Sequence, residues 1–199
     1  GRRGSAAWTS VLLIAAGGAV YLLGTELLLG GLLGTEAQQR TEAQLETAGN
    51  LILGGRPELG AFLALLAHRP IGFGFGVLLD LAGVNAAKAG MAATGYDPEN
   101  GYVERFMFGS GIELHSVTGD LWALTGLPGL ALAIMIAVIV FTGVVRRVAA
   151  GTASALFLFL VCWTGWNLLF SPLLSAAPSL ILLLGLALTR RDHPTSDPC

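Results

Sequence analysis

The run LWALTGLPGLALAIMIAVIVFTGVV, from Leu121 to Val145, contains no charged residue and decides the class of this protein. At ~1.5 Å of rise per residue, an α-helix of this length exceeds the ~30 Å hydrocarbon core of a bilayer. Two further apolar runs, from Ala6 to Leu33 and from Thr152 to Thr189, are also long enough to cross it. The sequence therefore predicts an integral membrane protein.

The overall composition favours the same class. Hydrophobic residues make up 54% of the 199 residues, charged residues only 12%, and the mean hydropathy is +0.71. Soluble domains carry about 25% charged residues. The chain has no basic stripe with interleaved aromatic residues, so we expect no nucleic-acid partner. Its two cysteines, Cys162 inside an apolar run and Cys199 at the end, predict neither a disulfide nor a cysteine metal site.

The run from Thr152 to Thr189 is longer than one crossing requires. Ser171-Pro172 interrupts it near its middle, and proline disfavours helix continuation because it lacks a backbone N–H and clashes with the preceding turn. We therefore expect two helices joined by a tight hairpin. With the two other runs, this predicts an all-α polytopic membrane protein with about four transmembrane helices.

Paired arginines predict the orientation of these spans. The pairs are Arg2-Arg3, Arg146-Arg147 and Arg190-Arg191. In a four-span chain both ends and the connection after the second span share one compartment, and all three pairs fall there. Because short segments rich in Lys and Arg remain in the cytoplasm, we expect both termini to be cytoplasmic.

The chain then divides into four parts: a first transmembrane helix (1–33), an extracytoplasmic loop (34–120), three transmembrane helices (121–189) and a cytoplasmic tail (190–199). Tryptophans near the expected span ends predict anchors at the membrane interface, namely Trp8, Trp122, Trp163 and Trp166. Glycine pairs predict close contacts between helices, namely Gly17-Gly18, Gly30-Gly31, and Gly126 with Gly129. Since residue 1 is Gly rather than Met, we expect a processed or truncated chain.

The outer loop is expected to contain short helices. Residues 35–49 are polar and rich in helix formers, whereas Leu59–His68 is an apolar helix too short to span and suited to the interface. A glycine-rich turn at 72–76 follows, then a mildly amphipathic stretch from Val77 to Thr94. Residues 95–101 form an irregular surface segment rich in turn-forming residues.

Residues 55–140 carry an ordered series of motifs. Arg56 precedes the short apolar helix, Arg69-Pro70-Ile71-Gly72-Phe73-Gly74-Phe75-Gly76 follows it, and Leu114-His115-Ser116 stands before Trp122, Gly126 and Gly129-Leu130. This order resembles the bacterial O-antigen ligase and polymerase superfamily, in which a turn of the type R/P-x-G-x-G precedes a large outer loop and a His-Asn stands near the next span. Ser116 replaces that Asn here. Family members carry about ten or more spans, so the chain resembles their C-terminal portion.

The resemblance implies a glycosyltransferase of polysaccharide biosynthesis in the cell envelope. Such an enzyme moves a glycan from undecaprenyl diphosphate to an acceptor at the outer face of the bacterial inner (cytoplasmic) membrane. It uses no metal, nucleotide sugar or other cofactor. The implied partners are a lipid-linked oligosaccharide or polysaccharide, membrane lipids, and further transmembrane segments of the same protein.

The resemblance also assigns roles to individual residues. His115 is the expected catalytic base or acceptor-orienting residue, because neutral imidazole can take a proton from a hydroxyl near neutral pH. Arg56 is expected to be catalytic by stabilising the diphosphate leaving group, since its planar fork of donors matches phosphate. The expected substrate-binding residues are Arg69, Arg105, Gly72, Gly74 and Gly76. Glu113 or Asp120 is expected to orient the His115 ring, although Asp120 also suits a cap of the second span.

Each assignment has a plainer alternative. His115 could be an interfacial residue, Arg56 a solvated loop charge, and Arg69 a cation at a helix C-terminus. Asp97 and Glu99 flank a proline in a turn, which favours a solvated loop over a divalent-cation site. Two other functions remain open. In a transporter segment the arginines and His115 would line a path, and in a non-catalytic membrane scaffold they would tolerate substitution.

Overall fold

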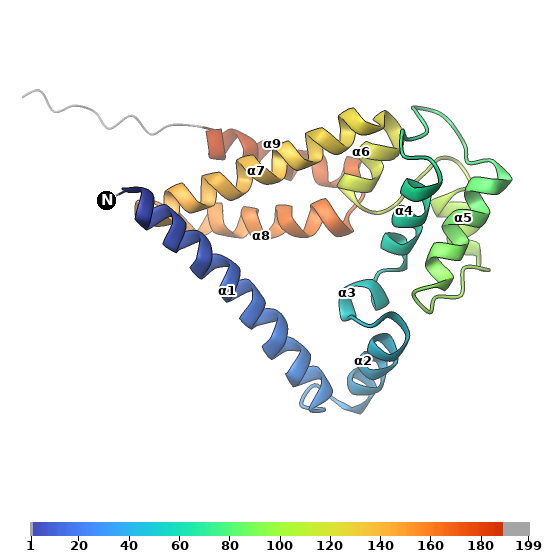
Figure 1. The fold of residues 1–199 in the computed structure, drawn as a ribbon, viewed down its shortest axis with the longest axis horizontal. Helices are drawn as coiled ribbons and strands as arrows, with labels where there is room; N and C mark the ends of the chain where they lie inside the picture. Colours follow the sequence, from blue (N-terminus) through green and yellow to red (C-terminus); the bar gives the residue numbers. More distant parts are fainter. Residues whose placement is uncertain (1, 189–199) are drawn as a thin grey trace, which may run out of the picture.

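The computed structural model describes residues 2–188 (Figure 1). The regular secondary structure of these residues is helical, with no strand among them. Arg190-Arg191, Cys199 and the expected tail 190–199 lie outside the described residues. The all-α class is therefore confirmed for the described part of the chain. The α-helices are α1 (Arg2–Leu29), α2 (Thr35–Ala48), α3 (Leu51–Gly54), α4 (Pro57–His68), α5 (Leu81–Ala92), α6 (Val117–Thr125), α7 (Leu127–Ala149), α8 (Ala155–Phe170) and α9 (Leu173–Leu188), and η1 (Val103–Met107) is a π-helix.

Two helices are long and apolar enough to cross a membrane: the 24 residues Ala6–Leu29 of α1 and the 23 residues of α7. Helices α8 and α9 have 16 residues each, which corresponds to ~24 Å of helix. The hairpin between them is confirmed, because α8 ends at Phe170 and α9 begins at Leu173, on either side of Ser171-Pro172. The count of four crossings stays a prediction.

The composition of the apolar run 121–145 led us to expect one continuous helix. The structure instead divides it into two. It breaks at Gly126, whose φ of 72° lies in the left-handed region and separates α6 from α7. A Cβ at Gly126 would overlap the carbonyl oxygen of Ile71. Since glycine alone adopts this conformation without strain and lets the neighbouring backbone approach, Gly126 both ends α6 and seats the glycine-rich turn against it.

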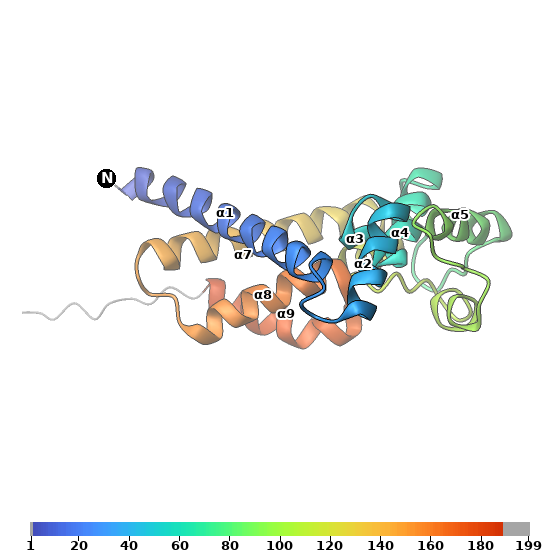
Figure 2. The ribbon, with the colours of Figure 1, turned by 90° about the horizontal axis from the view of Figure 1, so that it is seen from below.

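The described residues form two apolar cores that share α6. One core joins α4, α5, η1 and the segment before α6, with fully buried Trp122 at its centre. The other lies among α6, α7, α8 and α9, which lie side by side as a bundle (Figures 1 and 2). The prediction that Trp122 anchors the membrane interface is therefore wrong: its ring meets Phe62 and Phe73 edge-on, and its indole N–H donates to the Pro70 carbonyl at 2.9 Å.

Helix α1 stands apart from the bundle. It meets α7 near its N-terminal end and diverges from it toward α2 (Figure 1). Within its apolar window no residue is buried, and a Cβ at Gly17 or Gly18 would meet nothing within 4 Å. The prediction that this glycine pair makes a close helix contact therefore fails among the described residues. Gly126 and Gly129 do pack closely, against Ile71 and Leu121.

The helix ends adjoining the arginine pairs gather at one end of the molecule. Figure 1 shows the N-terminal end of α1, the C-terminal end of α7 and the C-terminal end of α9 together. There Arg147 donates to the Leu186 carbonyl of α9 and lies over the Phe157 ring of α8, 4.6 Å from its centroid. The opposite end carries α6, the α8–α9 turn and the helices of the outer loop (Figure 1).

The predicted loop helices are largely present. Helix α2 covers nearly all of the expected range 35–49, and α4 begins two residues before Leu59, with Pro57 in its first turn. Helix α5 begins later than expected because Asp80 caps it, its carboxylate accepting from the Gly83 N–H at 2.7 Å. Helices α4 and α5 then cross at Gly60 and Gly90, where each glycine lies directly against the other's backbone.

Candidate functional site

Arg56 lies at the start of α4, next to the C-terminal end of α8. Its guanidinium carbon lies over two α8 rings, 5.1 Å from the centroid of Trp166 and 5.3 Å from that of Phe170. Within residues 2–188, the Arg56 guanidinium forms no ion pair with a carboxylate. A cation over an aromatic face is attracted by the negative face of the ring. Arg56 is therefore held against α8 with no carboxylate partner among these residues.

His115 and Glu58 meet on the phenol of Tyr102. The Tyr102 hydroxyl donates to Glu58 Oε1 at 3.1 Å and lies 3.4 Å from His115 Nδ1. The Tyr102 and His115 rings are tilted by 45°, with centroids 5.8 Å apart. Arg56 precedes Glu58 by two residues at the start of α4, and its charge lowers the pKa of Tyr102, so Arg56 lies within electrostatic range of the phenol that His115 contacts.

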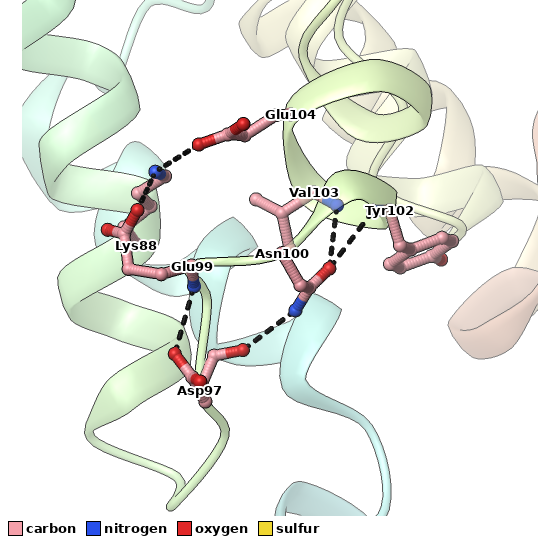
Figure 3. A network of polar contacts seen from close by, with 7 residues as sticks. All are labelled: Lys88, Asp97, Glu99, Asn100, Tyr102, Val103 and Glu104. Carbon is pink, nitrogen blue, oxygen red and sulfur yellow. Dashed lines mark hydrogen bonds and ion pairs between the residues drawn. The ribbon is translucent and has the colours of Figure 1, made fainter.

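A polar network holds Tyr102 at this position (Figure 3). The side-chain oxygen of Asn100 accepts from the backbone N–H groups of Tyr102 and Val103, at 3.0 and 3.1 Å. Lys88 of α5 contacts two carboxylates on either side of that segment, Glu99 at 2.8 Å and Glu104 at 3.3 Å. The segment before η1 is thus tied to α5, which sets where the Tyr102 ring points.

The backbone of His115 is strained. Its φ of 48° is the one positive value at a non-glycine residue among the described residues, and such conformations cost about 1–3 kcal/mol. Ser116, the next residue, caps α6 by accepting from the Gly119 N–H at 3.2 Å and donates to the Leu168 carbonyl of α8 at 2.9 Å. Ser116, which stands where the resembling family has Asn, therefore fixes the His115 segment to α8.

Asp120 neither orients His115 nor caps the second span, contrary to both expectations. Its carboxylate accepts from the backbone N–H of Leu114 at 2.8 Å and from that of Leu173, the first residue of α9, at 2.9 Å. Burial raises the pKa of Asp120, and these two hydrogen bonds oppose the rise. Asp120 thus joins the His115 loop to the start of α9. Glu113 is exposed, and no ion pair joins it to His115 within the described residues.

The surroundings also shift the pKa values of Tyr102 and Lys88. Burial raises the pKa of Tyr102, and the neighbouring Glu58 carboxylate raises it further while Arg56 lowers it. Tyr102 therefore stays protonated and can act as a donor. The hydrogen bond to Glu99 raises the pKa of Lys88 above its ordinary value, so this lysine stays charged.

The other expected arginines lie elsewhere. Arg69 follows the last residue of α4, at the other end of this 12-residue helix from Arg56, which is ~18 Å long. Its guanidinium lies over Phe73, 5.3 Å from the ring centroid. Arg105 lies in η1 and is exposed. Within residues 2–188, Arg56 contacts the rings of α8 and His115 contacts Tyr102, and neither Arg69 nor Arg105 shares these contacts.

The glycine-rich turn also belongs to the far end of α4. Gly72, Gly74 and Gly76 all have positive φ, at 79°, 103° and 71°. A Cβ at Gly72 would lie 2.5 Å from the Trp122 carbonyl oxygen and 2.7 Å from the Gly126 Cα. The N–H groups of Phe73 and Gly74 both donate to the Ala123 carbonyl, at 2.9 and 3.0 Å. These contacts give the turn a packing role against α6.

Asp97 and Glu99, the acidic residues of the surface segment 95–101, make their contacts with nearby residues of the outer loop. Asp97 accepts from the Glu99 N–H at 3.0 Å, and Glu99 pairs with Lys88 (Figure 3). Among the described residues there is no group of three or more His, Cys, Asp or Glu side chains placed to hold a metal ion. The solvated-turn interpretation of Asp97 and Glu99 therefore describes their contacts best.

An apolar groove of about 330 Å³ runs between α1, α7 and α8. Leu13 of α1, Phe141 of α7 and Leu168 of α8 contribute to its lining. Val161, Gly165 and Leu168 form its α8 wall. At ~100° per residue they lie on the opposite face of α8 from Trp166 and Phe170, the rings that carry Arg56.

Sequence reasoning missed four residues of this cluster. Glu58, Tyr102 and Phe170 carried no motif, and Trp166, which is 48% exposed, was assigned only to the membrane interface. Their juxtaposition depends on contacts between segments that are far apart in the chain, which no local pattern encodes. No family model, curated protein or solved structure matches the chain. The functional assignment therefore rests on the geometry of these side chains.

Proposed function

We propose that this protein is an O-antigen ligase- or polymerase-like glycosyltransferase of the bacterial inner membrane. It takes a glycan from undecaprenyl diphosphate at the outer face and transfers it to a hydroxyl acceptor, without a metal or a nucleotide sugar. The motif order from Arg56 to Gly129 supports this family assignment, with Ser116 as its main departure.

One observation carries the proposal: the Tyr102 phenol contacts His115 and Glu58, and it lies within the electrostatic range of Arg56. A glycosyl transfer from a lipid diphosphate needs a cation for the leaving group and a base for the attacking hydroxyl. Arg56 offers free donors on an aromatic support, and His115 offers an imidazole held by its neighbour. The two residues supply the two requirements.

The proposed reaction assigns each proton and electron pair. His115 Nε2 takes the proton of the acceptor hydroxyl, whose oxygen forms a bond to the anomeric carbon of the donor sugar. The bond from that carbon to the diphosphate oxygen breaks, and the lipid diphosphate leaves with the electron pair. Arg56 stabilises the growing negative charge through charge-assisted hydrogen bonds.

The membrane arrangement in this proposal has four crossings, an outer loop and cytoplasmic termini. The grouping of the arginine-bearing helix ends at one end of the molecule supports it (Figure 1). The groove between α1, α7 and α8 suits the isoprenoid chain of the carrier, since its lining is apolar. Further transmembrane segments of the same protein would complete the resemblance to the family.

The test is transfer in lipid nanodiscs from an undecaprenyl-diphosphate-linked oligosaccharide to an acceptor glycan, in the presence of a chelator. We expect activity in the intact protein, with loss in Arg56→Ala and in His115→Ala. Arg40→Ala is the matched control, because Arg40 is an exposed arginine of the expected outer loop whose ion pair, within residues 2–188, is with Glu36 on its own helix. Transfer that persists in both site variants, or that requires a divalent metal, would overturn the proposal.

A further inference from the structure

The hydrogen bonds around Tyr102 can be satisfied in only one way when Glu58 is ionised. A carboxylate has no proton to donate, so the 3.1 Å contact requires the Tyr102 hydroxyl to donate to Glu58. A phenol has a single proton, which this bond uses. The remaining Tyr102 contact, to His115 Nδ1 at 3.4 Å, then requires the phenol oxygen to accept.

This direction of donation determines the tautomer of the histidine. If the Tyr102 oxygen accepts from Nδ1, then Nδ1 carries the ring proton. In a neutral imidazole the other nitrogen, Nε2, then holds a free lone pair. The Nε2–H tautomer, which free imidazole side chains favour in water, would present a donor to the acceptor hydroxyl and could not take its proton.

We propose that Glu58 and Tyr102 are positioning residues that hold His115 as its Nδ1–H tautomer, so that Nε2 is the base for the attacking hydroxyl. The catalytic part of this inference rests on the proposed function, whereas the tautomer itself does not. Neither residue touches the reacting atoms. When Nε2 takes the proton, the imidazolium keeps its Nδ1–H toward the Tyr102 oxygen, and the Glu58 carboxylate stabilises the new positive charge through the phenol.

The burial of Tyr102 supports the same assignment. Burial and the Glu58 charge both raise its pKa, so the phenol retains the proton that it donates. The Asn100 network fixes the Tyr102 backbone, and the Ser116 hydrogen bonds fix the residue after His115. Both rings are therefore held on supports that are independent of any ligand.

The test is nitrogen NMR of the full chain, labelled with ¹⁵N-histidine in nanodiscs, at about pH 8, where an ordinary imidazole is neutral. The chain contains three histidines, and the signals of His115 are assigned from their loss in His115→Gln. We expect the wild-type protein to show protonated Nδ1 and unprotonated Nε2 at His115. Protonated Nε2 in the wild-type protein would overturn the inference without any variant.

Two variants at Glu58 separate positioning from mere packing. In Glu58→Leu the Tyr102 proton is released to Nδ1, so His115 should switch to the Nε2–H tautomer. In Glu58→Gln the amide oxygen still accepts from Tyr102, so the Nδ1–H tautomer should be retained. Glu113→Gln is the matched control, because Glu113 is close in sequence to His115 but exposed, and should leave the spectrum unchanged. An unaltered tautomer in Glu58→Leu would remove Glu58 from this role.

Transfer kinetics distinguish failure of this inference from failure of the proposed function. Tyr102→Phe should lower kcat roughly 10- to 100-fold with little change in KM. A protein that transfers glycan but holds His115 as Nε2–H retains the proposed function and refutes the positioning role. A protein that holds Nδ1–H but transfers nothing retains the tautomer and refutes the proposed function.

Discussion

Gly72 and Gly126 lie backbone against backbone, so that a Cβ on Gly72 would lie 2.7 Å from the Gly126 Cα. This contact joins the glycine-rich turn after α4 to the break between α6 and α7. It positions one end of α4, and the opposite end of the same helix carries Arg56 and Glu58. The turn that was expected to bind substrate packs against α6, at the far end of α4 from Arg56.

Substitution of Gly72 by Ala should destabilise the protein more than substitution of Gly76. Both glycines have positive φ, which costs an alanine about 1–3 kcal/mol. Only Gly72 has backbone neighbours where the methyl group would lie, whereas nothing lies within 4 Å of a Cβ at Gly76. Thermal unfolding in detergent measures the difference. Equal losses in the two variants would show that the Gly72–Gly126 contact is not retained in solution.

The orientation of the chain predicts the accessibility of two introduced cysteines. In a background with Cys162 and Cys199 replaced by Ser, an impermeant maleimide should modify Asn85→Cys in intact cells, because Asn85 is exposed on α5 in the expected outer loop. Ser196→Cys, in the expected cytoplasmic tail, should react only after lysis. The reverse pattern would invert the topology.

Arg56→Lys should weaken binding of undecaprenyl diphosphate although the charge is kept. Lysine cannot present two parallel donors to a phosphate and lies less well on the Trp166 and Phe170 faces. A loss of about 1–3 kcal/mol corresponds to a rise of about 5- to 150-fold in Kd. Native mass spectrometry with the carrier lipid measures it, and an unchanged Kd in Arg56→Ala would exclude this arginine from the diphosphate site.

His115→Ala should lower the rate of glycan transfer by roughly 10²- to 10⁴-fold, because a hydroxyl is a poor nucleophile until a base takes its proton. Membrane insertion should be unchanged, since His115 lies outside both helices that are long enough to cross. Single-turnover transfer and membrane fractionation measure the two effects. Near wild-type transfer in the variant would favour the transporter or scaffold function.

Asp120 predicts a pH dependence of stability with a definite sign. Its pKa is raised in the folded state by burial, so folding favours the protonated carboxyl. The contribution of Asp120 to the free energy of unfolding is therefore fully present below the ordinary pKa of Asp, ~3.9. It is lost as the pH rises through the raised pKa of the folded state. Asp120→Asn should flatten this part of the Tm–pH curve. The opposite result would be a wild-type Tm that rises with pH in this window, with the rise absent in Asp120→Asn. It would show that the two N–H hydrogen bonds to Asp120 outweigh the effect of burial on its pKa.

Local patterns predicted the helices well and their ends less well. Helix α2 was predicted from the polar composition of residues 35–49, and α4 from the apolar run 59–68. The α8–α9 hairpin was predicted from Ser171-Pro172. The break at Gly126 was missed although the sequence carries a local sign of it, since Pro128 stands in the first turn of α7 directly after this glycine. The approach of Ile71 then shows why glycine is required there.

The candidate site was predictable only in its two central residues. The motif order named Arg56 and His115, and the structure places His115 on Tyr102 and Arg56 on the rings of α8. Asp120 and Glu113 were favoured as orienting groups because they are close to His115 in sequence. The His115 ring instead contacts Tyr102, which directly precedes η1. Side-chain partners of this kind are set by tertiary packing, which sequence spacing does not report.

A single turn of α8 carries both halves of the site. Trp166 and Phe170 support Arg56, and between them the Leu168 carbonyl accepts from Ser116, next to His115. A substitution that displaces this part of α8 would therefore disturb the support of Arg56 and the anchor of the His115 segment together, although neither residue belongs to α8.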